Sequence, residues 1–162
     1  MNAIVAVGSD YGIGRDNDLI FNIPEDKKFF RSMTAGKTVV MGRKTLESMP
    51  GGKPLPKRRN IVLSRDASYA PEGVETVHSF EELFELIKDI PSDEVFLIGG
   101  AEVYNALLDR CDKAYVTHVR DSRPADKFFP NIEKMPQWSM EYTSEEKEYE
   151  GTKFVFCTYV RK

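Results

Sequence analysis

The sequence predicts one α/β domain, residues 1–162, with a central mixed, mostly parallel β-sheet of about eight strands flanked by about four helices. Three observations support this fold class. Short, continuous apolar runs, typical of strands covered on both faces, alternate with helical stretches. The last third of the chain carries longer runs rich in Tyr, Val, Thr and Phe, which favour antiparallel strands. No internal repeat, low-complexity segment or linker interrupts the pattern.

The expected strands fall into two groups. Short apolar runs predict central parallel strands over residues 3–7, 38–41, 61–63 and 95–98, with residues 74–77 as a weaker candidate. The longer runs over residues 114–119 and 153–160 predict antiparallel strands at one side of the sheet.

Four helices are expected between these strands, over residues 24–34, 43–49, 79–88 and 101–108. Pro24 suits the first turn of the first helix, and Gly36 follows its end. Ser79 with Glu82 three residues later has the spacing of a capping box. Each helix therefore begins at a recognisable start signal or directly after a strand.

Composition and charge exclude several classes of function. The 23 basic and 26 acidic residues give a net charge of −3, which argues against a general nucleic-acid binder. A mean hydropathy of −0.43 without a long apolar run excludes a membrane span. Residues 1–7 lack a basic segment and fit an opening strand rather than a signal peptide, so a cytoplasmic location is expected. No exposed apolar stripe is evident, and we expect a monomer.

The cysteines and histidines give no sign of a disulfide scaffold or a metal site. Cys111 and Cys157 are the only two cysteines, which fits reduced thiols in a cytosolic protein. His78 and His118 are the only histidines, and no cluster has the spacing of metal ligands. We therefore expect no metal.

Basic residues follow one predicted strand, at the start of the next helix. Gly42, Arg43, Lys44 and Thr45 open the helix over residues 43–49. A helix N-terminus favours anions over cations, so two cations there make sense if a phosphate lies between them and the free N–H groups. The alternative is a solvated basic corner.

Two other strand ends also favour a phosphate-binding site. Gly99 and Gly100 let the backbone approach a pyrophosphate closely, although the fingerprint G-x-G-x-x-G is absent and a tight turn is the alternative. Ser64 and Arg65 follow a third strand, and Arg in such a place accommodates the 2′-phosphate of NADP. Ligands of open α/β sheets bind at the carboxyl ends of the strands, so the three ends together favour a phosphorylated dinucleotide.

One similarity to a phosphate-binding motif fails. Residues 36–38 read Gly-Lys-Thr, but the first glycine of the P-loop pattern would fall at Arg31, and the triplet precedes a strand rather than a helix. A phosphotransferase is therefore disfavoured.

Asp26 is a carboxylate on the apolar face of its predicted helix. Phe29, Phe30 and Met33 follow it by three, four and seven residues, which places all four side chains on one face. Stabilising the helix dipole is worth only about 0.3–1 kcal/mol, and the surface residue Glu25 can do this. Burying a carboxylate costs more unless it is paired, so we expect Asp26 to serve a ligand or a reaction and to have a raised pKa.

The order and spacing of several short motifs resemble the dihydrofolate reductase family of the common bacterial chromosomal type. The motifs span essentially the whole chain: Ile13-Gly14 with Asn17, residues 22–26, 40–45, 55–61, 98–104 and 115–118, and Asp126 with Phe129-Pro130. The resemblance implies a dihydrofolate reductase-like fold and NADPH-dependent reduction of 7,8-dihydrofolate to tetrahydrofolate by hydride transfer. It also implies a role in one-carbon metabolism and in thymidylate and purine synthesis, and sensitivity to antifolate inhibitors.

The resemblance carries roles for individual residues on the substrate side. Asp26 would hydrogen-bond the pterin and promote protonation of its ring nitrogen, Thr117 would hold that carboxylate, and Arg58 would grip the glutamate α-carboxylate as a bidentate pair. The catalytic set implied is Asp26, Thr117 and Phe21. The substrate-binding set implied is Ile4, Val5, Asp26, Lys27, Phe30, Met49, Leu55, Arg58 and Thr117.

The cofactor side follows from the same resemblance. The nicotinamide end would meet the start of the chain and residues 9–22, which match the mobile lid of the family, with Asp126 as a loop contact that helps it close. The implied cofactor-binding set is Ala6, Ile13, Gly14, Asn17, Leu19, Gly42, Arg43, Lys44, Thr45, Leu63, Ser64, Arg65, Ile98, Gly99, Gly100, Ala101, Glu102, Val103 and Tyr104.

The chain departs from the family pattern at a few positions. Phe21 stands where Trp is common, Ile20 replaces a common Pro, and Lys27 replaces an apolar residue so that only its stem could pack on a ligand. The loop over residues 50–53 is longer than in many members. Two other interpretations stay open, namely an NADPH-dependent pyrimidine reductase of the riboflavin pathway and a nucleotide-binding module without catalysis. Asp26 and Arg58 favour folate over the pyrimidine.

Overall fold

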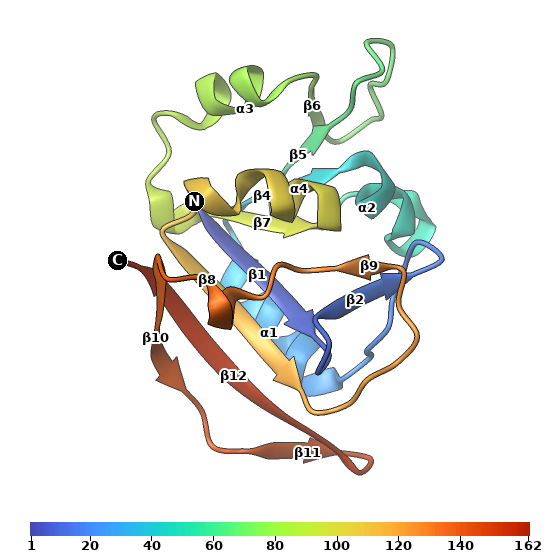
Figure 1. Ribbon diagram of the computed structural model, residues 1–162. Coiled ribbons are helices and arrows are strands. Elements are labelled where there is room, and N and C mark those ends of the chain that lie inside the picture. The colour runs from blue at the N-terminus through green and yellow to red at the C-terminus, as the bar shows by residue number, and fades with distance from the viewer.

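The computed structural model describes residues 1–162 and contains one large and one small β-sheet. The large sheet has the strand order β10-β12-β8-β1-β7-β4-β5-β6, with β11 paired to the outer part of β12 (Figure 1). Its strands are β1 (Asn2–Val7), β4 (Thr38–Gly42), β5 (Arg59–Leu63), β6 (Glu75–Val77), β7 (Val95–Gly99), β8 (Lys113–Val119), β10 (Trp138–Thr143), β11 (Lys147–Tyr149) and β12 (Thr152–Arg161).

The pairing directions confirm the predicted mixed, mostly parallel sheet. The six strands from β8 through β1, β7, β4 and β5 to β6 are parallel to their neighbours. The long strand β12 pairs antiparallel with β8, and β10 pairs antiparallel with β12. Each strand expected from the sequence is present, and its observed bounds differ by no more than two residues from the expected ones.

The four predicted helices are also present. They are α1 (Pro24–Thr34), α2 (Arg43–Ser48), α3 (Phe80–Ile87) and α4 (Ala101–Leu107), and short 3₁₀ turns lie at Pro50–Gly52, Ser92–Glu94, Leu108–Arg110 and Ile132–Lys134. Ser79 caps α3 as expected, because its Oγ accepts from the backbone N–H of Glu82 at 3.1 Å. The reciprocal bond of a capping box is shifted by one residue, since the Glu82 carboxylate accepts from the backbone N–H of His78.

The small sheet was not anticipated. Its order is β3-β2-β9, formed by β2 (Gly12–Arg15), β3 (Asp18–Leu19) and β9 (Lys127–Phe128). These strands are two to four residues long, and β2 contains two glycines, so they carry no alternating apolar pattern. β10 and β11 were missed as well, because their side chains are mostly exposed.

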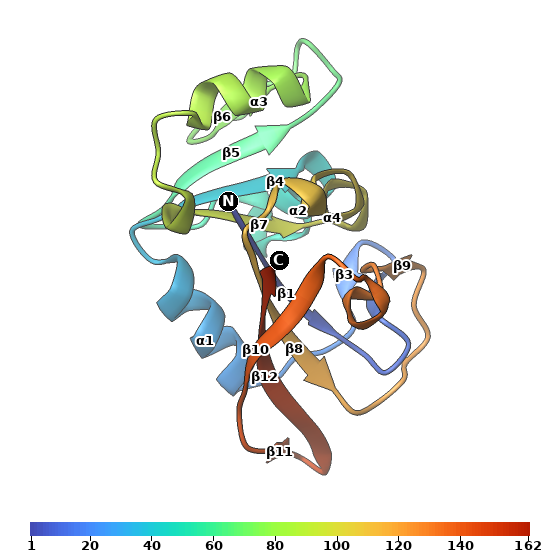
Figure 2. The same cartoon turned by 60° about the vertical axis from the view of Figure 1, so that its left-hand side comes forward.

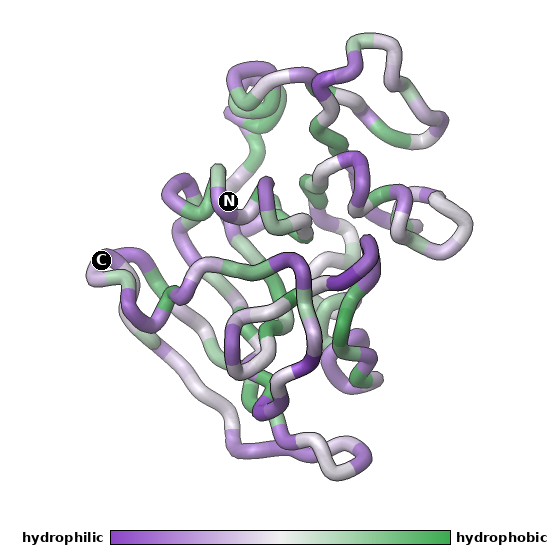
Figure 3. Tube along the Cα trace, turned by 45° about the vertical axis from the view of Figure 1, so that its right-hand side comes forward, coloured by the Kyte–Doolittle hydropathy of each residue, from purple (hydrophilic) through white to green (hydrophobic).

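The two faces of the large sheet bury different clusters of side chains. Successive residues of a strand point to opposite faces, so Ile4 joins a cluster with Val39, Met41 and Phe96, and Ala3 joins the larger cluster on the other face. Helix α1 covers the first face beside β8 and β12, and the small sheet lies on the opposite side (Figure 2). Apolar segments follow the central strands (Figure 3). None of the helices is long and apolar enough to cross a membrane.

Candidate active site

The three strand ends singled out in the sequence meet at one edge of the sheet. β4 lies between β5 and β7, with Gly42 opposite Leu63 and Met41 opposite Gly99. The carboxyl ends of parallel strands share one edge, which is where ligands of such sheets bind. The three segments therefore lie together at the edge where such a sheet binds its ligands.

Glycines at this edge allow the backbone to approach its neighbours closely. A Cβ at Gly99 would lie 3.2 Å from Thr45 Oγ1, and one at Gly100 would lie 3.3 Å from the same atom. Gly99 also has φ +137°, a conformation that glycine adopts without a steric cost. Helices α2 and α4 both begin here, capped by Gly42 and Gly100 without a side-chain bond. The first turns of both helices therefore keep backbone N–H groups without a side-chain cap, and the hydroxyl of Thr45 lies beside the glycine pair.

Two arginines lie beside these glycines, and carboxylates hold both. Arg43 Nε is 3.2 Å from Glu47 Oε2, and Arg43 Nη1 is 3.4 Å from Asp66 Oδ2. Its guanidinium stacks 4.2 Å above the ring of Tyr69, a residue that the sequence did not single out. The side chain of Arg65 is 93% exposed, with Nη2 3.1 Å from Glu102 Oε1. Lys44 is exposed and Ser64 half-buried.

Asp26 lies in the first turn of α1, where Pro24 begins the helix, and faces the sheet. Its Oδ1 accepts a hydrogen bond of 2.7 Å from the buried hydroxyl of Thr117 on β8. Burial raises the pKa of Asp26 above its usual value, and the bond from Thr117 opposes part of that shift. Phe29, Phe30 and Met33 pack with the cluster on the same face, which confirms the predicted apolar stripe. A half-buried carboxylate with a raised pKa is suited to exchange a proton with a bound ligand.

The remaining residues expected around the substrate lie on both faces of the sheet. Ile4 is buried in the cluster behind α1, and its carbonyl accepts from the hydroxyl of Tyr104 at 2.7 Å. Val5 packs instead against the cluster on the opposite face, so only its main chain borders the side of Asp26. Met49 and Leu55 are half-buried, and Lys27 is exposed.

The guanidinium of Arg58 is oriented by its neighbours. Nε donates to Thr34 Oγ1 at 2.8 Å, and Nη1 donates to the carbonyl of Pro56 at 2.9 Å. The group also lies 5.9 Å from the ring centre of Phe30. Nη2 makes no hydrogen bond to the protein, so it can donate to an anion.

Residues 9–22 lead from β1 through the small sheet to α1. The backbone N–H of Asp16 donates to Asp126 Oδ2 at 3.0 Å, and the N–H of Asp126 donates to the carbonyl of Gly14 at 2.9 Å. The structure thus shows the expected loop contact of Asp126. Ile13 is buried, whereas Asn17 is exposed and Leu19 is 73% exposed.

Phe21 ends this segment inside a small apolar cluster. It packs with Ile23, Val119 and Phe154, and the guanidinium of Arg123 lies 4.9 Å from its ring centre. Phe21 has no polar side-chain atom, so it cannot hold or transfer a proton. Any part it has in catalysis is limited to packing.

Comparisons with known proteins agree with this geometry. A family model described as dihydrofolate reductase matches residues 1–161. Dihydrofolate reductase of Haemophilus influenzae is 40% identical over 151 residues, 93% of this chain and 91% of that protein. The enzyme of Neisseria meningitidis serogroup B is 39% identical over 158 residues, 98% of this chain and 96% of that protein.

A solved structure extends the likeness to three dimensions. Dihydrofolate reductase from Enterococcus faecalis, complexed with NADP(H) and RAB-propyl, superimposes with a TM-score of 0.90 at 34% identity. The match covers 99% of this chain and 95% of that chain. The match of the family model along almost the whole length, the relatives near 40% identity and this superposition lead to one conclusion: the chain belongs to the dihydrofolate reductase family.

Proposed function

We propose that the protein reduces 7,8-dihydrofolate to 5,6,7,8-tetrahydrofolate with NADPH as the reductant. The observation that carries this proposal is the half-buried carboxylate of Asp26, hydrogen-bonded to Thr117 on the face of the sheet beneath α1. Membership of the family supports the reaction type. The carboxylate supplies the proton chemistry that reduction of a C=N bond requires.

Asp26 and Thr117 act on the pterin ring. The carboxyl of Asp26 pairs with the N–H and amino groups of the pterin and favours protonation of the ring nitrogen. Its raised pKa, caused by burial, keeps a proton available closer to neutral pH than for a free Asp. Thr117 fixes the orientation of the carboxylate through its 2.7 Å bond. Phe21 contributes by excluding water through its packing.

Apolar walls and one cation bind the rest of the substrate. Arg58 forms a bidentate pair with the glutamate α-carboxylate, and its support by Thr34 leaves the guanidinium oriented for that role. The stem of Lys27 covers the ligand from the exposed side. The substrate-lining set is completed by Ile4, Val5, Phe30, Met49 and Leu55.

The glycine-lined edge fits NADPH, which supplies the hydride when bound. Gly99 and Gly100 hold the pyrophosphate through backbone N–H groups that approach without an intervening Cβ, and Thr45 beside them adds its own N–H. Arg43, Lys44 and Arg65 bind the 2′-phosphate. The cofactor-binding set further comprises Ala6, Ile13, Gly14, Asn17, Leu19, Gly42, Leu63, Ser64, Ile98, Ala101, Glu102, Val103 and Tyr104.

The proposal extends to the setting in which the enzyme works. We expect a cytoplasmic monomer that supplies tetrahydrofolate for one-carbon transfer and that antifolate inhibitors bind. The two free cysteines, Cys111 and Cys157, fit a reducing compartment. Sedimentation of the purified protein tests the monomeric state.

A spectrophotometric assay tests the reaction directly. Adding dihydrofolate to the protein with NADPH should remove the absorbance of the reduced nicotinamide, and the aminopyrimidine substrate of riboflavin-pathway reductases should not. If that pyrimidine alone consumes NADPH, the substrate assignment is wrong. If NADPH binds but neither substrate consumes it, the protein is a nucleotide-binding module and the proposal fails.

A further inference from the structure

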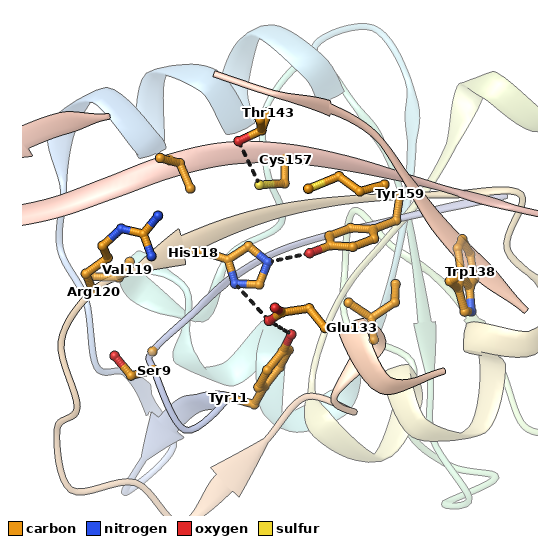
Figure 4. Close-up of a pocket in the computed structure, with 14 residues that line it drawn as sticks. Ser9, Tyr11, His118, Val119, Arg120, Glu133, Trp138, Thr143, Cys157 and Tyr159 are labelled. Atoms are coloured by element: carbon orange, nitrogen blue, oxygen red, sulfur yellow. Dashed lines mark hydrogen bonds and ion pairs between the residues drawn. The ribbon is translucent and has the colours of Figure 1, made fainter. Parts of the chain in front are cut away.

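A second group of polar side chains lies behind the active-site strand. Thr117 and His118 are neighbours on β8 and therefore point to opposite faces of the sheet. Thr117 faces Asp26, whereas His118 opens into a cleft of about 520 Å³ that Tyr11, Glu133 and Tyr159 also line (Figure 4). None of these four residues belongs to the substrate-binding or cofactor-binding sets.

The four side chains form a continuous chain of contacts. The hydroxyl of Tyr11 donates a hydrogen bond to Glu133 Oε1. The same oxygen lies 3.9 Å from His118 Nδ1, and His118 Nε2 is 2.8 Å from the hydroxyl of Tyr159 on β12. Figure 4 shows Glu133 between the phenol ring of Tyr11 and the imidazole of His118. The ring of Tyr11 also packs edge-on against the imidazole of His118, with ring centres 5.8 Å apart, so the residue before β2 contacts β8 directly.

Tyr11 lies in the turn between β1 and β2, near the start of the lid. Its φ of 67° lies in the left-handed region that bulky residues seldom adopt. Its backbone N–H donates to the carbonyl of Gly8, and its carbonyl accepts from Phe129 N–H, both at 2.9 Å. Tyr11 is only 7% exposed, and β2 begins at the next residue, Gly12. The side chain of Tyr11 therefore anchors an otherwise unfavourable turn at the root of the lid.

The charges around the cluster favour this hydrogen bond. Burial and the neighbouring Glu133 raise the pKa of Tyr11, so its hydroxyl keeps the proton that it donates. The pKa of His118 is lowered, because burial and the nearby Arg120 together outweigh the opposite effect of Glu133. The phenol is thus the donor that holds the Glu133 carboxylate in place near neutral pH.

We propose that Tyr11 and Glu133 are positioning residues, which hold the root of the lid against β8 so that the lid closes over the nicotinamide end in one arrangement. The inference rests on the proposed function, and it takes residues 9–22 as the lid that the family resemblance implies. Tyr11 precedes Ile13 and Gly14 by two and three residues, and His118 follows Thr117 directly. Tyr11 thus connects the segment proposed to meet the nicotinamide with the strand that carries Thr117.

Tyr11→Phe and Glu133→Gln test the proposal, with Tyr142→Phe as the matched control. Tyr142 is 55% exposed on β10 and has no assigned role. The measurements are the NADPH dissociation rate, the single-turnover hydride-transfer rate and the thermal unfolding midpoint. Tyr11→Phe should raise the dissociation rate and slow hydride transfer by about 3- to 10-fold each. Glu133→Gln keeps an acceptor and should have a smaller effect, and Tyr142→Phe should have none.

The double variant Tyr11→Phe/Glu133→Gln distinguishes a linked pair from two independent residues. It should match Tyr11→Phe alone, because the carboxylate has no lid contact left to lose. Additive effects would overturn the proposal, as would a lower unfolding midpoint with both rates equal to those of Tyr142→Phe. Should Tyr11→Phe not fold, Glu133→Ala carries the same expectation, since the side chain of Glu133 is 58% exposed.

The outcome is separable from that of the proposed function. NADPH dissociation is measured without dihydrofolate, and the wild type is assayed for turnover in parallel. If the wild type turns over normally and the Tyr11 and Glu133 variants keep the wild-type rates, only the positioning role is wrong. Absence of dihydrofolate-dependent turnover in the wild type overturns the proposed function itself.

Discussion

At the scale of single residues, Asp26 is held at a cost to stability. Burial raises its pKa above 3.8, so the folded state binds a proton more tightly than the unfolded state does. Stability from this group is fully present below pH 3.8 and is lost as the pH rises through the folded pKa. Asp26→Asn should therefore stabilise the protein at pH 7 by roughly 1 kcal/mol, about 2–4 °C in the unfolding midpoint. Thermal unfolding at pH 7 and pH 4 checks this, and an equal gain at both values would contradict it.

Arg43 and Arg65 are expected to discriminate between the two nicotinamide cofactors. Each lies at the edge where β4, β5 and β7 end, and each is held by a carboxylate that a 2′-phosphate can replace. Arg43→Ala or Arg65→Ala should reduce the NADPH-over-NADH preference in kcat/KM about tenfold. Arg110→Ala is the control, because that side chain stacks on Phe84 and has no assigned role. Equal losses with both cofactors would show that the residue does not read the 2′-phosphate.

The residues that sequence reasoning found and missed differ in a physical way. Asp26 was identifiable because its helix places one carboxylate among three apolar side chains, a local pattern. The pairing of Tyr11 with Glu133 joins positions 122 residues apart, and nothing near either residue signals it. Tyr69 escaped notice for the same reason, since its stacking on Arg43 joins a loop to the start of α2.

At the scale of elements, the cap of α3 offers a test independent of catalysis. Ser79 Oγ satisfies one N–H of the first turn. Ser79→Ala should lower the free energy of unfolding by about 1 kcal/mol, and Ser79→Thr should recover most of it. Chemical denaturation measures both variants. A change in kcat for Ser79→Ala would be unexpected, because α3 covers β5 and β6 rather than the site.

The contact between the lid and the loop before β9 is a second test at this scale. Asp126 Oδ2 accepts the N–H of Asp16, so Asp126→Ala removes the acceptor, whereas Asp126→Asn keeps one. Asp126→Ala should raise the NADPH dissociation rate by about 3- to 10-fold. Stopped-flow displacement gives that rate. Identical dissociation rates for Asp126→Ala and the wild type would show that this contact has no part in lid closure.

The elements that could be predicted share one property. Helices and central strands bury an apolar face, and that burial leaves a periodic pattern in the sequence. β3 and β9 are exposed and β2 buries only the side chain of Ile13, so the small sheet is held by backbone pairing, including that between the distant residues Gly14 and Lys127. Their existence depends on tertiary placement, so no local pattern indicates them.

At the scale of the whole molecule, strand order creates the site. β1 lies between β7 and β8, which come more than 90 residues later, and this insertion brings Thr117 to Asp26. The strands and their directions could be predicted from the sequence, but which distant strands pair with one another could not. The order places the carboxylate on the α1 face and the glycines at the adjoining edge of the same sheet.

The pH dependence of single-turnover hydride transfer in Asp26→Asn tests the central claim most directly. The account predicts a rate about 10²- to 10⁴-fold below that of the wild type at pH 7, the usual weight of a proton-handling group, with partial recovery in acid where solvent protonates the substrate. A variant that transfers hydride at the wild-type rate at pH 7 would contradict it.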